Sequence, residues 1–406
     1  MKPFSSTRAL IICICFILLG YSNFSLADED ADALNTRIEA LEKQLDEVKS
    51  LLKQQVQQSA TKAEVQAVKK DVEVAKAEQA EWKSYDSGVH LAGYGAVNYS
   101  TEDNSFNRAL FAPIFHYQFK DLFLLESELE INVQDDGSTE VALEYLTVDW
   151  FMNDYMALIA GKFLSPVGQF RQNLHPTWIN KMVNAPVGFG HDQASPIAEL
   201  GLQLRGGFPV GETMNANYAF YVSNGPILEL NEDGDEIEAV EYNASTDDAD
   251  DNKTFGGRVA LTPLANTEIG VSGAFGDIAI PGEDNRDYDV IGVDFFGRWK
   301  NFDLRGEYVR QQVDALVTSA APDSQEWEAF YTQLSYKLLP TKFEAVARYG
   351  DYNSNHADQE QEQWALGLNY LFAPNAMAKL TYEFNDGLVG TRTDQDQLLL
   401  QLTYGF

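Results

Sequence analysis

The chain ends in the stretch QLLLQLTYGF, residues 397–406, and this stretch decides the fold. Leu398, Leu400, Leu402, Tyr404 and Phe406 alternate with residues that are mostly polar or small. A period of two places the apolar side chains on one face of a β-strand and the other side chains on the opposite face. The stretch therefore predicts a last strand with one apolar face, which ends on an aromatic residue.

The first 27 residues have the features of a secretory signal peptide. Lys2 and Arg8 form a basic start, residues 9–20 are apolar, and residues 25–27 form an A-x-A-like cleavage site. A membrane anchor is the alternative, but a helical span needs roughly 20 apolar residues, and this run is shorter. We expect residues 1–27 to be removed. Cys13 and Cys15 would leave with them, so the mature chain would have neither a disulfide nor a thiol nucleophile.

The composition narrows the class of protein. The chain has 29 Lys and Arg against 62 Asp and Glu, so its net charge of −33 makes it a poor candidate for nucleic-acid binding. No apolar run of 18 residues follows the signal peptide, which excludes helical membrane spans. Aromatic residues nevertheless make up 12% of the chain, as is typical of transmembrane β-barrels with aromatic girdles. A large soluble all-β protein is the alternative.

Residues 28–82 predict an α-helical coiled coil. They contain neither Gly nor Pro. A heptad seam, with spacings of four and three residues, is formed by Leu34, Ile38, Leu41, Leu45, Val48 and Leu52. A single amphipathic helix lying on another surface is the alternative. Because no other segment offers a helical partner, we expect self-association, in the periplasm.

From residue 83 onward the chain predicts strands. Sixteen alternating segments are separated by turn residues: 89–101, 105–121, 122–134, 139–153, 155–167, 199–209, 214–225, 254–264, 267–277, 288–300, 302–314, 326–339, 342–352, 362–373, 377–386 and 396–406. Tight turns alternate with a second set of connections, which includes long loops at 168–198, 226–253, 278–287, 315–325, 353–361 and 387–395. An even strand number and this asymmetry are features of bacterial outer-membrane barrels, and the terminal Phe resembles their assembly signal. We therefore expect an all-β fold, a 16-stranded antiparallel transmembrane β-barrel over residues 83–406.

The alternation also predicts which face of each strand meets lipid. In 123–133, Phe123, Leu125 and Leu129 face one way, whereas Glu126, Glu128 and Glu130 face the other. Sixteen strands enclose an interior too wide for wall side chains alone, so the charged face would surround water. Other inward-facing candidates are Arg108, Arg205, Arg258, Arg298, Arg305, Arg348 and Lys379. Around 142–150 and 327–337 the alternation is poor and leaves the register open.

No catalytic or metal-binding constellation is visible. The five His residues lack metal-ligand spacing, and neither a G-x-S-x-G elbow nor a P-loop occurs. We expect no enzyme activity, no cofactor and no metal. An outer-membrane hydrolase is the alternative, since a catalytic triad need not be local in sequence.

The loop 168–198, which follows the fifth strand, carries apolar anchors such as Phe170, Trp178 and Phe189, and we expect it to fold into the lumen. With the preceding GKFLSPVG, residues 161–168, it resembles the phosphate-selective porins O and P, and the resemblance covers most of 85–406. That family implies a homotrimer whose basic constriction passes anions such as phosphate. By position, Arg171 and Lys181 match the constriction cations. The remaining constriction candidates are Lys162, His175 and Asp192.

The charges also leave alternatives open. The loop lacks a lysine cluster and the wall lacks a ladder of arginines, which favours a broad hydrophilic pore over phosphate specificity. Wall cations and acids could instead pair with one another. The loop 226–253, with eleven acidic residues and one Lys, predicts a solvated surface loop that shares divalent cations with lipopolysaccharide; a dedicated calcium site is the alternative.

These observations favour an outer-membrane porin for passive diffusion of small hydrophilic solutes or ions, surrounded by outer-membrane lipid and lipopolysaccharide. A barrel-anchored adhesin or envelope spacer, which would use the coiled coil and the acidic loops, is the alternative.

Overall fold

The computed structural model describes residues 87–406 apart from 135, 192, 232, 243–245 and 247–250, together with the helical residues Lys43, Asp46 and Ser50. The expected signal peptide, and the expected coiled coil apart from these three residues, lie outside the described residues. Residues from Tyr85 to Phe406 form a unit of their own. Among the described residues, none of the helices has the length and apolar character needed to cross a membrane.

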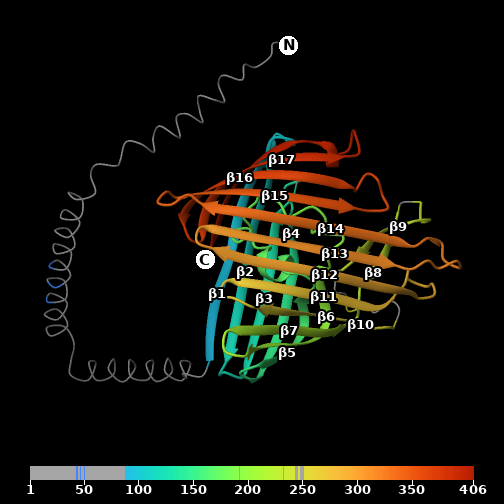
Figure 1. The fold of residues 1–406 in the computed structure, drawn as a ribbon, viewed down its shortest axis with the longest axis horizontal. Helices are drawn as coiled ribbons and strands as arrows, with labels where there is room; N and C mark the ends of the chain where they lie inside the picture. The colour runs from blue at the N-terminus through green and yellow to red at the C-terminus, as the bar shows by residue number, and fades with distance from the viewer. Residues whose placement is uncertain are drawn as a thin grey trace, which may run out of the picture. The chain divides into compact units, whose positions relative to one another are not determined.

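Sixteen antiparallel strands form a closed barrel, in which the first strand pairs with the last (Figure 1). They are β1 (Ser87–Ser100), β2 (Ser105–Phe119), β3 (Phe123–Val133), β4 (Thr139–Asn153), β5 (Met156–Leu164), β6 (Ala198–Val210), β7 (Met214–Ser223), β10 (Thr254–Thr262), β11 (Thr267–Ile278), β12 (Arg286–Trp299), β13 (Phe302–Val313), β14 (Gln325–Lys337), β15 (Phe343–Asn353), β16 (Gln361–Ala373), β17 (Ala376–Gly387) and β18 (Gln397–Gly405). The predicted barrel is confirmed. A separate hairpin of β8 (Ile227–Leu230) and β9 (Ile237–Glu241) interrupts the order between β7 and β10.

The C-terminal strand closes the barrel with its apolar face outward. Phe406 and Gly93 of β1 exchange two backbone hydrogen bonds, of 2.9 and 3.1 Å, and the ring of Phe406 stacks on Phe111 with centroids 6.1 Å apart. Leu402 is 60% exposed on the outer face, whereas its neighbour Thr403 is 1% exposed and faces the lumen. The predicted faces of this strand are confirmed.

The connections differ between the two ends of the barrel. Tight turns occupy one end, at 120–122, 154–155, 211–213, 263–266, 300–301, 338–342 and 374–375. The other end has the short connections 101–104 and 134–138 and the longer ones 165–197, 224–253, 279–285, 314–324, 354–360 and 388–396. This asymmetry agrees with the predicted alternation and is the arrangement of outer-membrane barrels.

Two local features explain where the sequence pattern was poor. In β4 the register with β3 shifts between Tyr145 and Leu143, so Glu144 is the extra residue of a β-bulge and interrupts the alternation. In β14 the large residues Trp327 and Tyr331 face inward and are buried, at 1% and 2% exposure. They face inward because a loop inside the barrel packs against them.

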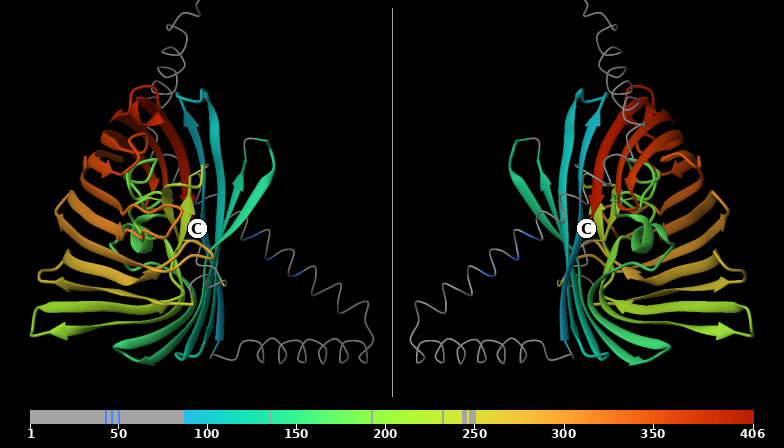
Figure 2. Two further views of the ribbon diagram at one scale, coloured as in Figure 1. Left: turned by 90° about the vertical axis from the view of Figure 1, so that its right-hand side faces the viewer. Right: turned by 90° about the vertical axis from the view of Figure 1, so that its left-hand side faces the viewer.

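Two segments of the long-loop end fold back and fill much of the lumen. The first is residues 165–197, which we call the inner loop; it is the green segment inside the ring of strands in Figure 2. The second is the β8–β9 hairpin. Together with inward side chains of the wall they build one apolar cluster, which includes Phe170, Phe189, Ile237, Val240 and Trp327. The expectation of charged walls around a water column is therefore correct for only part of the lumen.

Candidate pore constriction

The inner loop enters the lumen through backbone contacts with the opposite wall. The Gly168 amide donates to Ser272 Oγ at 3.1 Å, and the Phe170 amide donates to Glu307 Oε2 at 3.0 Å. Gly168 has φ +72°, and a Cβ there would lie 1.6 Å from Glu307 Oε1. A residue with a side chain would have to displace the carboxylate, so this position requires glycine.

Aromatic packing anchors the middle of the inner loop. The rings of Phe189 and Tyr331 meet edge to face at 5.0 Å, and Phe170 lies 6.3 and 6.4 Å from them. Such edge-to-face pairs stabilise a core beyond the area that they bury. These contacts confirm that the loop folds inward on apolar anchors.

The loop also contacts the strand that closes the barrel. Thr177 Oγ1 lies 2.7 Å from Thr403 Oγ1. Trp178 lies against Gly405, where a Cβ would come within 2.9 Å of three indole atoms. The small residue at 405 therefore makes room for the indole ring, which explains part of the pattern in the C-terminal stretch.

Wall cations hold the next part of the loop through its carbonyl groups. The Lys379 ammonium of β17, which is 2% exposed, donates to the carbonyl oxygens of Thr177, Asn180 and Met182 at 2.5, 2.6 and 3.0 Å. These carbonyls belong to or follow a helical turn, since the Asn180 amide donates to the Pro176 carbonyl at 2.9 Å. A cation at the carbonyl end of a turn is favourable.

Two further cations fix the same region. Arg348 of β15 donates to the carbonyl oxygens of Asn184 and Ala185, both at 3.0 Å. From the loop, Lys181 Nζ lies 3.0 Å from Glu344 and 3.6 Å from Asp303. Burial lowers the pKa of Lys181, while the two carboxylates act in the opposite direction. These cations bind the loop to the wall, so their charge is used within the protein.

Two cavities remain between the other edge of the inner loop and the wall formed by strands β2–β7, β10 and β11. The first cavity has a volume of about 170 Å³ and the second about 370 Å³. Gln172 of the loop and Arg205 of β6 line both of them. The cavities therefore lie side by side along one face of the loop, which makes this the candidate constriction.

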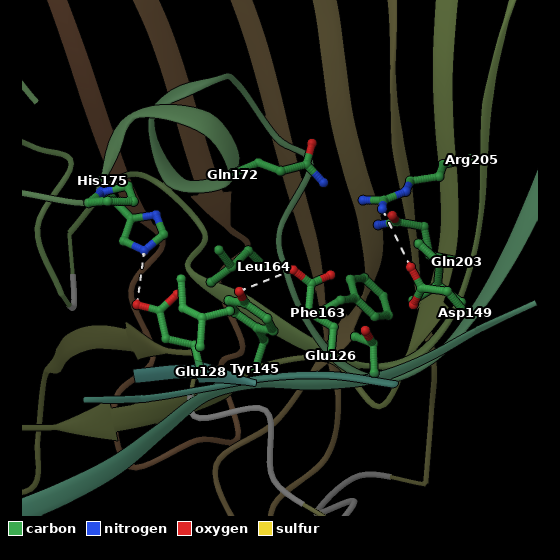
Figure 3. A pocket seen from close by; sticks show the side chains of 14 residues that line it. Glu126, Glu128, Tyr145, Asp149, Phe163, Leu164, Gln172, His175, Gln203 and Arg205 are labelled. Atoms are coloured by element: carbon green, nitrogen blue, oxygen red, sulfur yellow. Dashed lines mark hydrogen bonds and ion pairs between the residues drawn. The ribbon is translucent and has the colours of Figure 1, made fainter. Parts of the chain in front are cut away.

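The first cavity is lined by both polar and apolar side chains. On its polar side, Glu128 of β3 points toward His175 of the loop, and Asp149 of β4 points toward Arg205 of β6 (Figure 3). Glu126 of β3 and Gln172 of the loop also line this cavity. Its apolar lining consists of Ile114, Ile159, Phe163, Leu164 and Pro176. Three carboxylates face one arginine here, so the lining is acidic when His175 is neutral.

The structure separates the predicted constriction residues. His175 lines the first cavity; its Nδ1 donates to the Arg171 carbonyl at 2.5 Å, and its Nε2 lies 3.9 Å from Glu128 Oε1. Arg171 is 8% exposed, Lys162 is partly buried on β5, and neither they nor Lys181 line the two cavities. Asp192 lies outside the described residues. The role of these residues in a constriction stays a prediction.

The predicted wall residues lie on inward-facing positions, and the cations among them contact acidic groups or loop carbonyls. The ion pairs are Arg108–Glu130 at 2.8 Å, Arg205–Asp149 at 3.5 Å, Arg258–Asp294 at 2.6 Å, Arg258–Glu268 at 2.7 Å, Arg298–Asp303 at 3.1 Å, Arg305–Asp303 at 2.7 Å and Arg348–Glu383 at 3.8 Å. Glu126 lies 2.9 Å from His116. Mutual pairing, the alternative for these charges, is thus extensive.

Sequence reasoning missed five polar lining residues of the first cavity: Tyr145, Thr147, Asp149, Gln172 and Gln203. Tyr145 and Asp149 follow the bulge in β4 and alternate with the outward Leu146 and Val148, so the period of two past the bulge could have found them. Within the described ranges, no group of three or more His, Cys, Asp or Glu side chains could hold a metal ion.

The β8–β9 hairpin belongs to the long-loop end of the barrel and packs into the apolar cluster inside it. Ile237 is 0% exposed, and its carbonyl accepts a hydrogen bond from His356 Nε2 at 2.8 Å. Gln359 Nε2 donates to Glu238 at 2.9 Å. The expectation of a solvated surface loop over 226–253 is therefore wrong for these two strands, because their apolar side chains join the cluster inside the barrel.

Comparison with known proteins agrees with this architecture. A family model described as Gram-negative porin matches residues 128–388. No curated protein matches the chain in sequence. The outer membrane channel DcaP of Acinetobacter baumannii is similar in structure, with 11% identity, a TM-score of 0.52 and coverage of 80% of this chain and 99% of that chain. An anion-selective porin from Comamonas acidovorans has 14% identity, a TM-score of 0.52 and coverage of 79% and 100%. OmpF of Salmonella typhi, solved with daunomycin, has 12% identity, a TM-score of 0.51 and coverage of 79% and 97%.

Proposed function

The chain belongs to the Gram-negative porin family, and from this premise we propose that it forms a water-filled outer-membrane channel for passive diffusion of small hydrophilic solutes and ions. The observation that carries the proposal is the pair of cavities between the inner loop and the wall, each lined in part by charged and polar side chains, inside a barrel whose outer face is apolar. The solute path would run along Gln172 and Arg205, which both cavities share. No chemical step is involved.

The lining of this path argues against a channel that is specific for phosphate or other anions. An anion pathway needs an excess of basic groups that face the solute. Arg205 faces the proposed path, but Glu126, Glu128 and Asp149 line the first cavity with it, so acidic groups outnumber the arginine there. The similarity to the anion-selective porin from Comamonas acidovorans, at 14% identity, concerns the fold.

We further propose that the channel is a homotrimer, surrounded by lipid and lipopolysaccharide, with residues 28–82 as a coiled coil in the periplasm. An apolar groove on the outer face supports a subunit contact. It lies between β1, β2, β3 and β18 and is lined by Val97, Phe111, Val133, Leu402 and Phe406, among others. Graded crosslinking of the full chain in detergent, followed by a denaturing gel, tests this: monomer, dimer and trimer bands are expected, and a ladder that stops at the dimer or at the monomer would contradict the trimer.

Planar-bilayer recording tests the channel itself. Purified protein should insert in discrete conductance steps, grouped in threes if the trimer is correct. The alternative of an adhesin or envelope spacer predicts that the folded barrel inserts without any conductance. Silent insertion, verified by protease protection of the barrel in the same vesicles, would contradict the channel.

A further inference from the structure

We propose, on the basis of the channel function proposed above, that the first cavity is a binding subsite for small organic cations. The ligand would carry a primary ammonium or guanidinium group on a short apolar body. The subsite would hold such a solute at the narrow part of the path and favour its passage over that of anions of the same size.

The first observation is that two buried carboxylates each have one oxygen atom without a hydrogen-bond partner. Glu128 and Asp149 are both 1% exposed. Glu128 Oε1 and Asp149 Oδ1 have no hydrogen-bond partner among the described residues. The nearest cationic contacts, His175 Nε2 at 3.9 Å from Glu128 and Arg205 at 3.5 Å from Asp149, exceed the roughly 2.7–2.9 Å of charge-assisted hydrogen bonds. A buried carboxylate is stable when such donors surround it, so both groups would gain from an N–H donor in the cavity.

A neutral side chain independently points to the same ligand. Gln203 of β6 is 1% exposed and lines the first cavity beside Asp149 (Figure 3). Neither its Oε1 nor its Nε2 has a hydrogen-bond partner within the described part of the chain. Leaving a buried amide unpaired costs about 1–3 kcal/mol. A guanidinium group, with five N–H donors, could serve the Gln203 oxygen and a carboxylate together.

The apolar side chains that line the first cavity favour an organic cation over an inorganic one. Ile114 of β2, Ile159 and Phe163 of β5 and Pro176 of the inner loop line the same cavity as the carboxylates. A hydrated sodium or potassium ion would gain nothing from these side chains, whereas an alkyl chain would be removed from water there. The combination of apolar and acidic side chains in the lining therefore fits a cation with an apolar body.

The charged side chains that line the first cavity are mostly acidic, which favours a cationic ligand. Glu126, Glu128 and Asp149 line the first cavity together with one arginine, Arg205. Glu126 also accepts a hydrogen bond from the Tyr145 hydroxyl at 3.3 Å, so this carboxylate is directed along the wall. An alkyl carboxylate of the same size would contact the same apolar side chains, but the acidic side chains would repel its charge. It is therefore the matched control ligand.

Single-channel block tests the subsite on the full chain in planar bilayers. We expect n-butylguanidinium to block the current in a concentration-dependent way, and n-butyrate to block it far less. Asp149→Asn and Glu128→Gln should each weaken the block roughly tenfold or more, as expected for loss of a hydrogen bond to a charged group. Gln203→Met, which keeps the charge, should weaken it roughly fivefold. Glu212→Gln, an equal charge change in the exposed turn 211–213, should leave it unchanged.

The outcomes separate this inference from the channel on which it rests. Only open channels are measured, so every block value comes from folded protein. If channels open normally but butylguanidinium and butyrate act alike, or if none of the three cavity variants changes the block, the subsite is wrong and the channel stands. If the folded wild type never conducts, the channel proposal fails and the subsite fails with it.

Discussion

Lys379 illustrates how a single wall cation can serve the architecture of a pore. Its ammonium group is buried and contacts three backbone carbonyls of the inner loop, the longest contact being 3.0 Å. A carbonyl that loses such a donor without access to water costs about 1–3 kcal/mol. An inward-facing lysine is therefore insufficient evidence for an anion path, because the loop itself can be its ligand.

Replacing Lys379 by Met should release this part of the inner loop. We expect the free energy of unfolding in detergent to fall by about 2 kcal/mol or more, because three carbonyls lose their donor. Single-channel recordings should show a larger or noisier conductance. Lys337→Met, at an exposed position near the end of β14, is the control and should change neither quantity. An unchanged conductance together with unchanged stability would show that Lys379 does not hold the loop.

At the level of strands and loops, the features that could be predicted are those that follow from local periodicity in the sequence. The outward row of Leu400, Leu402 and Tyr404 could be read directly, as could the alternation of tight turns and longer loops. The bulge at Glu144 could not be placed, since one extra residue changes the phase without any signature in composition. In β14 the inward Trp327 and Tyr331 reversed the pattern, because they pack on a loop that is distant in sequence.

The same limit applies to the candidate site. The inward direction of Arg258 and Lys379 followed from alternation, but their partners did not. Lys379 and the Thr177 carbonyl are 202 residues apart in the chain. Which acid or carbonyl neutralises each cation depends on how the loop folds inside the barrel, and no local pattern encodes that. The β8–β9 hairpin was missed because the acidic residues around it dominate the composition.

The β8–β9 hairpin offers a test at the mouth. Ile237→Asp places a carboxylate at a position that is 0% exposed, and burying it would cost several kcal/mol. We expect the hairpin to leave the lumen instead, which should raise the single-channel conductance and expose the buried strand β9 (Ile237–Glu241) to protease. Asp233→Ala, at the exposed tip of the hairpin, is the control. If the conductance and the cleavage pattern match those of the wild type, the hairpin does not narrow the mouth.

For the barrel as a whole, the apolar outer face determines where a charged substitution destabilises the protein. Leu366 is 50% exposed on the outer face near the middle of β16. Leu366→Arg should lower the free energy of unfolding in lipid vesicles by roughly 2–4 kcal/mol, since a charge at the bilayer midplane is costly. Leu339→Arg, in the tight turn 338–342, should lower it by only about 0–1 kcal/mol. Equal effects at both positions, measured by denaturant titration, would contradict the membrane orientation.

The contact between Thr177 and Thr403 has a consequence for biogenesis. These residues are separated by 226 positions, and Trp178 lies on Gly405 of β18, the last of the barrel strands in chain order. Contacts between such distant residues form late. The pore would therefore reach its final width only after β18 has paired with β1. An assembly intermediate that enters the membrane before this pairing would conduct ions through a wider opening.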